Sequence, residues 1–240
     1  MRVAYFDCSH GISGIAALAA LIDAGADVDY LSKELEFLGS DLPIVNTHDV
    51  VLEEFRVRRV SVESGGAQVG RRVADLEALL SASGLPDAVR DLALRIYRRL
   101  AEAEARVHGS SPDVVRFHEI GSLRSIVGVV GSALAIEQLG IDEVVASPLP
   151  FGRGTVDTEH GRLTVPAPVT LELLRGLPVV PQEVAGELVT PTGAAILAVA
   201  ATSVGQIPAM TIDSIGFGAG EPRHPEIVSR VVVGRGSDRS

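Results

Sequence analysis

The chain has 240 residues, of which 46% are hydrophobic, and its mean hydropathy is +0.29, so it can bury a full core in one domain or in two small ones. Its formal net charge is −10 and its pI is about 5.1. This composition argues against a disordered chain and against a nucleic-acid partner, because nucleic-acid sites depend on clustered Lys and Arg.

The cysteine content and the start of the chain bear on its compartment. A single cysteine excludes an internal disulfide and suits a reducing environment. The first residues are already strand-like, without the basic segment and apolar core of a signal peptide. No apolar run reaches the roughly 18 residues that would span a bilayer. We therefore expect a cytoplasmic protein with no membrane partner.

The first quarter of the chain predicts two strands and a helix. A short apolar segment at residues 3–6 predicts a buried strand, and residues 7–14 form a small, polar loop. A helix is expected over residues 15–24 with Gly25 at its C-terminal cap. The alternating segment 50–63 predicts one strand, with a bulge where the alternation slips at Arg58-Arg59.

The middle of the chain predicts a strand between helices. Apolar residues at helical spacing predict a helix over residues 71–81 and a second one from Pro86 to Gly109. The short apolar segment 114–120 predicts a strand that leads into a helix ending near Leu139. This last helix is apolar almost all round, so it should be buried.

The final part continues the alternation of strands and helices. Expected strands lie at 144–150, at 155–156 paired with 163–165, and at 178–181, 210–215 and 227–233. Expected helices lie at 169–175 and 194–201. The glycine-dense segment 216–220 is expected to separate the last two strands. The alternation predicts an α/β fold: a mixed, mostly parallel sheet flanked by helices, with a more antiparallel C-terminal third. We expect a single domain over residues 1–236, any sub-boundary lying near residue 150, and a frayed tail at 237–240.

Three apolar strands of this scheme each run into a short, polar loop that opens a helix. The loops are residues 7–14, 118–122 and 190–193. A helix start offers unpaired N–H groups and the positive end of a dipole, so each loop suits an anion, phosphate above all. If the loops meet at the carboxyl ends of neighbouring strands, they line a ligand crevice. The residues expected to bind the ligand or its phosphate are Ser9, Ser13, Gly14, Ser122, Arg153, Thr190 and Thr192.

The loops also carry candidate catalytic groups. Asp7 ends a strand beside the glycine-rich loop, and His118 and Glu119 adjoin a helix start. Successive strand residues point to opposite faces, so His118 and Glu119 can reach one site only if the strand has already ended. The alternatives are a loop-capping Asp7, a histidine satisfied by its neighbours and a carboxylate that accepts N–H groups at the helix start.

Three further side chains are of types that bind transition metals. Cys8 could ligate a metal as a thiolate, since a nearby helix start lowers a thiol's pKa, or it could be a small core residue. His10 could ligate metal or lie on the surface, and His160 occupies an expected turn. We take Cys8, His10 and His160 as the candidate metal ligands.

Seven motifs occur in order from the first strand to about Gly220, and together they resemble the nickel insertion protein (LarC) family of nickel-pincer cofactor biosynthesis. The motifs are Phe6-Asp7-Cys8 with Gly11-Ile12-Ser13-Gly14, Phe117-His118-Glu119-Ile120-Gly121-Ser122, Ser147-Pro148-Leu149 with Gly152-Arg153-Gly154, His160-Gly161 with Val165-Pro166-Ala167-Pro168, Leu171-Glu172-Leu173-Leu174-Arg175-Gly176, Thr190-Pro191-Thr192-Gly193-Ala194-Ala195-Ile196-Leu197, and Gly216-Phe217-Gly218-Ala219-Gly220.

The resemblance implies the N-terminal component of a CTP-dependent cyclometallase, an enzyme of the lyase class. Such an enzyme inserts nickel, its substrate metal, into pyridinium bisthiocarboxylic acid mononucleotide and forms nickel–carbon and nickel–sulfur bonds. CTP and a divalent ion are expected to act through a C-terminal domain on a separate partner chain, in a homo-oligomer. The implied phosphorylated pyridinium dithio-ligand agrees with the phosphate-binding character of the loops.

The resemblance also has departures. Ile15, Arg124 and Gly128 occupy positions where the family pattern leads us to expect aspartate, and Gly65-Gly66-Ala67-Gln68 replaces an expected histidine-rich stretch. Carboxylates and imidazoles hold divalent ions, so these departures bear on metal chemistry. The alternative function is a non-catalytic paralogue that binds a phosphorylated small molecule or a partner chain.

Overall fold

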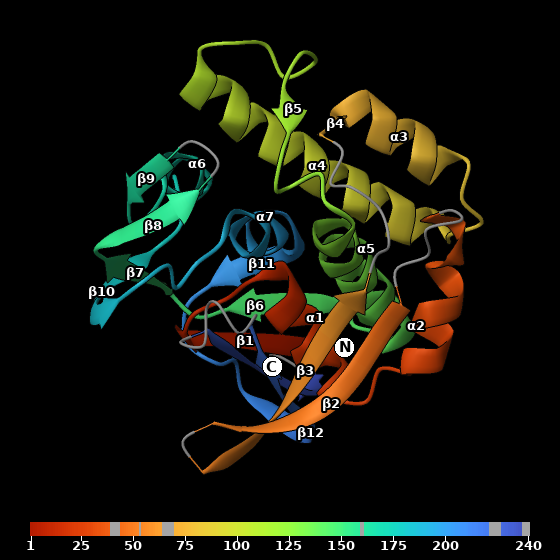
Figure 1. Ribbon diagram of the computed structural model, residues 1–240. Coiled ribbons are helices and arrows are strands. Elements are labelled where there is room, and N and C mark those ends of the chain that lie inside the picture. Colours follow the sequence, from red (N-terminus) through yellow and green to blue (C-terminus); the bar gives the residue numbers. More distant parts are fainter. Residues whose placement is uncertain (39–43, 53, 64–69, 159–160, 221–226, 237–240) are drawn as a thin grey trace.

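A mixed seven-stranded sheet forms the base of the structure, a computed structural model that describes residues 1–38, 44–52, 54–63, 70–158, 161–220 and 227–236 (Figure 1). Across the sheet the strands are β11 (Ala201–Val204), β6 (Glu143–Ala146), β1 (Arg2–His10), β13 (Val228–Gly236), β12 (Met210–Ala219), β3 (Phe55–Glu63) and β2 (Ile44–Leu52).

The strands of this sheet pair in both directions. β6 is parallel to both β1 and β11, and β12 is parallel to β3. β13 is antiparallel to both β1 and β12, and β2 is antiparallel to β3. The mixed α/β class is confirmed, and so is the antiparallel character of the C-terminal strands.

Helices and three small sheets complete the described fold. The helices are α1 (Gly14–Asp23), α2 (Val28–Glu34), α3 (Val73–Ser81), α4 (Asp87–His108), α5 (Leu123–Gln138), α6 (Pro168–Leu173) and α7 (Pro191–Ala200), with a 3₁₀ turn at Glu36–Leu38. The small sheets pair β4 (Arg71–Arg72) with β5 (Arg116–Phe117), β7 (Leu149–Arg153) with β10 (Val179–Ala185), and β8 (Thr155–Thr158) with β9 (Gly161–Thr164). In the part of the chain that the structure describes, we find no helix with the length and apolarity to cross a membrane.

Helix α1 lies directly on the sheet because two residues of β12 have no side chain. A Cβ at Gly216 would lie 1.9 Å from the carbonyl oxygen of Ala20, and one at Gly218 would lie 2.0 Å from that of Ala16. The glycine-dense segment that we expected to separate two strands is therefore mostly strand, and that prediction is wrong. Its glycines allow a helix backbone to approach the sheet.

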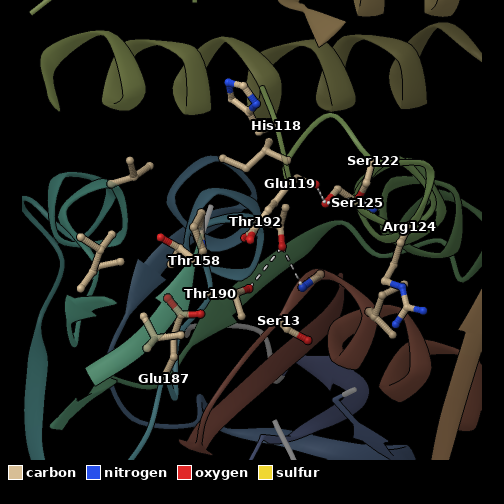
Figure 2. Close-up of a pocket in the computed structure, with 18 of the residues that line it drawn as sticks. Ser13, His118, Glu119, Ser122, Arg124, Ser125, Thr158, Glu187, Thr190 and Thr192 are labelled. Carbon is tan, nitrogen blue, oxygen red and sulfur yellow. Dashed lines mark hydrogen bonds between the residues drawn. The ribbon is translucent and has the colours of Figure 1, made fainter. Parts of the chain in front are cut away.

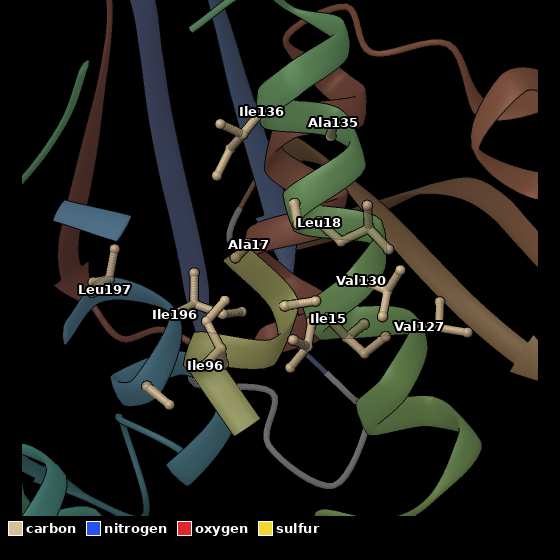
Figure 3. Close-up of a cluster of buried hydrophobic side chains, with 14 of the residues drawn as sticks. Ile15, Ala17, Leu18, Ile96, Val127, Val130, Ala135, Ile136, Ile196 and Leu197 are labelled. Atoms are coloured by element: carbon tan, nitrogen blue, oxygen red, sulfur yellow. The ribbon is translucent and has the colours of Figure 1, made fainter. Parts of the chain in front are cut away.

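The core fills the space between α1, α4, α5 and α7 (Figure 3). Leu18 of α1, Ile96 of α4, Val130 of α5 and Ile196 of α7 are each at most 1% exposed. Helix α5 also approaches α1 closely, since a Cβ at Gly128 would lie 2.9 Å from a backbone carbon of Gly14. This packing brings the first turn of α1 against the second turn of α5.

Three other expectations about strands are corrected. Segment 50–63 belongs to a β2–β3 hairpin rather than to one bulged strand: Glu54 has a positive φ of 73°, and the pairing continues regularly through Asp49↔Arg58. The turn was missed because no Gly or Pro marks it.

Segment 144–150 is divided between β6 and β7 at Ser147-Pro148, where the last backbone bond to β1 is Ser147 N–H to Phe6 O at 2.8 Å. Segment 114–120 contains only the two-residue β5, which pairs with β4 outside the large sheet. The loop at 118–122 therefore does not rise from the large sheet.

Candidate functional site

A cavity of about 530 Å³ lies where the first turns of α1, α5 and α7 converge (Figure 2). Each of the three polar loops contributes to its wall: the residues involved are Ser13, Gly14, His118, Glu119, Ser122, Thr190 and Thr192. The convergence expected from the sequence is confirmed, but the loops do not follow neighbouring strands of one sheet. Residues 7–10 of the first loop belong to β1 of the large sheet, the second loop follows β5 of a small sheet, and the third follows the isolated bridge of Val189 to Ile12.

Backbone hydrogen bonds join the first loop to the third. The Ile12 N–H donates to Leu188 O at 2.8 Å, and the Thr190 N–H donates to Ile12 O at 3.0 Å. A Cβ at Gly193 would lie 2.5 Å from Ile12 O, so glycine is needed for the approach. The two loops thus form one rigid wall.

Serine side chains cap two of the converging helices. Ser13 Oγ accepts from the Ala16 N–H at 3.1 Å at the start of α1, and Ser122 Oγ accepts from the Ser125 N–H at 3.2 Å at the start of α5. Both serines are largely buried. Capping uses one N–H group of each first turn, and the remaining ones have no partner within the helix.

Two threonines join the start of α7 to the start of α1. Thr190 Oγ1 accepts from the Gly193 N–H at 3.3 Å and lies 3.2 Å from Thr192 Oγ1. Thr192 Oγ1 in turn accepts from the Gly14 N–H at 3.3 Å (Figure 2). Thr190 is therefore the N-cap of α7, and Thr192 fixes the two helix starts relative to each other.

The second loop turns sharply as it leaves β5. Arg71 Nη1 donates to Gly121 O at 2.6 Å, and a Cβ at Gly121 would lie 2.5 Å from Phe117 O. Because β5 ends at Phe117, His118 and Glu119 no longer follow the alternation of a strand, and both line the cavity. Their side chains are exposed, so each can meet an incoming ligand.

Four charged residues of the cavity wall were not predicted as site residues. They are Glu104 of α4, Arg124 in the first turn of α5, Asp157 of β8 and Glu187 before the third loop. Glu187 is only 8% exposed. The sequence offered a signal for two of these site residues. Glu187 lies three residues before Thr190, and Arg124 lies two residues after Ser122. Glu104 offers no such signal, because only tertiary packing brings the C-terminal part of α4 to the cavity.

Asp7 lies outside the described cavity wall, in an ion pair with Arg230 across the β1–β13 ladder. The hydroxyl and the N–H of Ser9 both donate to Asp7 Oδ1. Burial opposes ionisation of this carboxyl, but the Ser9 hydrogen bonds and the Arg230 charge outweigh it, so the pKa of Asp7 is lowered. The structure thus assigns Asp7 and Ser9 to a local polar network.

Cys8 and His10 also lie away from the described wall. Cys8 is fully buried, its N–H donates to Ser147 Oγ at 2.9 Å, and burial raises the pKa of its thiol strongly. His10 is exposed at the end of β1, opposite Val228. The structure does not bring these two candidate metal ligands to the cavity.

Arg153 is exposed at the end of β7, and its Nη1 lies 2.6 Å from Glu183 Oε2. It is outside the described lining of the cavity. His160, residues 65–68 and the tail at 237–240 lie outside the described residues. Within the described ranges, we find no group of three or more His, Cys, Asp or Glu side chains placed to hold a metal ion.

The departures from the family pattern meet at this cavity. Ile15 and Arg124 both line it, and Gly128 packs against Gly14 beside it. Of the three positions where aspartate is expected, one therefore carries an apolar side chain, one carries a cation and one makes a close backbone contact.

Comparison with known proteins identifies the family of the chain. The family model described as "Nickel insertion protein" matches residues 4–239. A protein of Geotalea uraniireducens named "Putative nickel insertion protein" is 46% identical over 98% of this chain and 61% of its own length. No solved structure matches the chain.

Another relative is named for its substrate. The "Pyridinium-3,5-bisthiocarboxylic acid mononucleotide nickel insertion protein" of Desulfitobacterium hafniense strain DCB-2 is 41% identical over 92% of this chain and 55% of its own length. The chain thus spans about 60% or less of the length of these two relatives. With the family model matching almost every residue and these relatives aligned along nearly its whole length, the chain belongs to the nickel insertion protein family.

Proposed function

We propose that this chain is the N-terminal component of a cyclometallase that inserts nickel into pyridinium-3,5-bisthiocarboxylic acid mononucleotide. The observation that carries the proposal is the convergence of three helix starts on one cavity of about 530 Å³, a volume typical of small-molecule sites. The mononucleotide carries a phosphate, the group that helix starts bind best. The relative from Desulfitobacterium hafniense is named for insertion into this mononucleotide, which supports the choice of substrate.

The proposed roles follow from the cavity wall. The first-turn N–H groups of α1, α5 and α7 that the capping bonds do not use hold the phosphate, within a frame set by Ser13, Ser122, Thr190 and Thr192. His118 and Glu119 are the proposed catalytic groups because both face the cavity and can bind nickel or accept a proton. Nickel enters as a substrate.

We extend the proposal to a partner chain and to CTP. The aligned region covers 61% and 55% of the lengths of the two relatives described above. In the proposed scheme, a partner chain equivalent to the unaligned remainder supplies the use of CTP with a divalent ion.

Reconstitution tests the proposed reaction. The chain is combined with the partner chain, Ni²⁺, CTP, Mg²⁺ and the dithio-mononucleotide, and the product is identified by mass spectrometry. The expected result is a product that carries nickel and has lost protons, formed only when both chains are present. Absence of metallated product from a mixture in which the chain binds the mononucleotide would contradict a catalytic role.

A specific observation favours a second candidate, a paralogue that binds a phosphorylated small molecule or a partner chain without metal chemistry. Ile15 and Arg124 give the wall beside the α1 and α5 starts an apolar and cationic character, which suits an anionic ligand better than a metal ion. This candidate predicts that the mononucleotide binds equally well with and without Ni²⁺. The cyclometallase predicts nickel-dependent turnover.

A further inference from the structure

The β8–β9 hairpin contributes to the cavity wall as a separate ribbon. Among the described strands, β8 and β9 pair only with each other, and Figure 1 shows the hairpin to one side of the large sheet. At its base the Val165 N–H donates to Gly154 O at 3.0 Å. Gly154 has a φ of 97°, and a Cβ there would meet no described atom within 4 Å. The hairpin is therefore held by its own pairing and leaves its base open.

The register of the hairpin gives its two faces different characters. Val156 lies opposite Leu163, and both residues line the cavity. The next cross-strand pair, Thr155 with Thr164, is exposed and lies outside the described lining. Successive residues of a strand point to opposite faces, so the two pairs belong to different faces of the ribbon. The hairpin thus turns an apolar pair toward the cavity and a polar pair away from it.

The apolar pair is only half-buried in the folded chain. Two further apolar residues at the start of α6, Ala167 and Val169, line the same cavity. Small-molecule sites are lined mainly by apolar side chains, with a few polar groups that fix the ligand. Here the helix starts supply the polar groups, and the hairpin supplies apolar surface that a ligand can cover.

We infer that Val156 and Leu163 recognise the pyridinium ring by packing against one of its faces. This inference rests on the proposed function and adds two specificity-determining residues to it. The ligand of that function carries its thiocarboxylic groups at ring positions 3 and 5. These groups lie at the rim of a flat ring, so the faces of the ring stay free to pack against apolar side chains. Covering the pair removes its apolar surface from water, which stabilises the complex.

Two probes that differ by the ring test this contact. The dicarboxylate analogue of the mononucleotide, with oxygen in place of both sulfurs, keeps the ring, the anionic groups at its rim and the phosphate. Ribose 5-phosphate keeps the phosphate and lacks the ring. Titration calorimetry measures the affinity of the wild-type chain for each probe, and the same measurement is made on Val156→Thr and on Leu163→Asn. Both substitutions replace an apolar side chain by a polar one of similar size.

The matched control variants are Thr155→Ser and Thr164→Asn. They alter the neighbouring cross-strand pair of the same hairpin, on the face turned away from the cavity. Circular dichroism melting checks the fold of every variant. If Leu163→Asn does not fold, Leu163→Ala must show the same selective loss of affinity.

The ring contact predicts a selective loss. Val156→Thr and Leu163→Asn should each weaken binding of the dicarboxylate analogue by about fivefold, the effect of losing roughly one buried methyl group. Both should leave the affinity for ribose 5-phosphate within about twofold of the wild type. The control variants should bind both probes as the wild type does. Hydrogen exchange adds a readout that a purely structural role would not move, because the analogue should slow exchange of the hairpin amides and ribose 5-phosphate should not.

The two ways of failing are distinguishable. If the wild type binds neither probe, the proposed function fails and the ring contact fails with it. If the wild type binds the analogue no more tightly than ribose 5-phosphate, the ring contributes nothing and only the ring contact is overturned. Equal effects of the hairpin variants on both probes, or equal losses in the control variants, would also overturn the ring contact alone.

Discussion

The Thr192 hydroxyl accepts a hydrogen bond from the Gly14 N–H at 3.3 Å, although the two residues are 178 positions apart in the sequence. This contact joins the first turn of α7 to the first turn of α1. Together with the close approach of Gly14 and Gly128, it sets the spacing of the three helix starts around the cavity. The geometry of the site is therefore a property of loop packing as much as of the sheet.

Replacement of Thr192 by valine tests this link. The variant keeps the shape of the side chain but removes the acceptor for the Gly14 N–H, which should cost about 1 kcal/mol in the free energy of unfolding. Urea denaturation measures that loss, and affinity for ribose 5-phosphate should fall with it. Thr211→Val, on exposed β12 surface, is the matched control and should change neither quantity. Equal effects of the two substitutions would contradict the role of Thr192.

Replacement of Gly128 by alanine tests the approach of α5 to α1. Alanine ordinarily stabilises a helix relative to glycine by about 1 kcal/mol. Here the added Cβ would lie 2.9 Å from a backbone carbon of Gly14, so the net effect should be a destabilisation of about 1–3 kcal/mol in urea unfolding. Gly84→Ala has no atom within 4 Å of the new Cβ and serves as control. A stabilised Gly128→Ala would refute the packing.

Asp7 should make stability depend on pH. Its pKa is lowered in the folded state from an ordinary value of 3.8, so its contribution is present above that value and is lost as the pH falls through the lower, folded pKa. Asp7→Asn should therefore be less stable than the wild type at pH 7, and the difference should shrink as the pH falls below about 4. Guanidinium denaturation at several pH values measures it. A pH-independent difference would show that the Arg230 pair does not stabilise the fold through charge.

Cys8 should be inert in the folded protein. Burial raises the pKa of the thiol, and the fully buried sulfur is closed to reagents. Iodoacetamide at pH 8 should therefore leave the native chain unmodified and label it completely in 8 M urea, as followed by mass spectrometry. Rapid labelling of the native chain would place Cys8 at an accessible site and restore it as a candidate metal ligand.

Local patterns predicted the described α-helices other than α2, because the information for them lies within a few residues. The apolar stripe between Pro86 and Gly109 became α4, which ends at a left-handed Gly109, and the all-apolar segment before Leu139 became the buried α5. Polar residues at helix starts also identified the loops that meet at the cavity. Those predictions needed only the 3.6-residue period and capping chemistry.

Strand assignments failed where tertiary contacts decide the outcome. Gly216 and Gly218 looked like a break, yet they belong to β12 because α1 needs their missing side chains in order to pack. β11 was not predicted, since it directly follows α7 without a turn signal. Glu104 reaches the cavity only through the folded arrangement, so no pattern within the sequence marked it.

The central claim is that the three helix starts form one phosphate-accepting site, and a crystal of the chain soaked with the dithio-mononucleotide and Ni²⁺ tests it most directly. The account predicts phosphate density in the cavity, with oxygens about 3 Å from first-turn N–H groups of α1, α5 or α7. Ligand density at another surface, with the cavity free of it, would contradict the account.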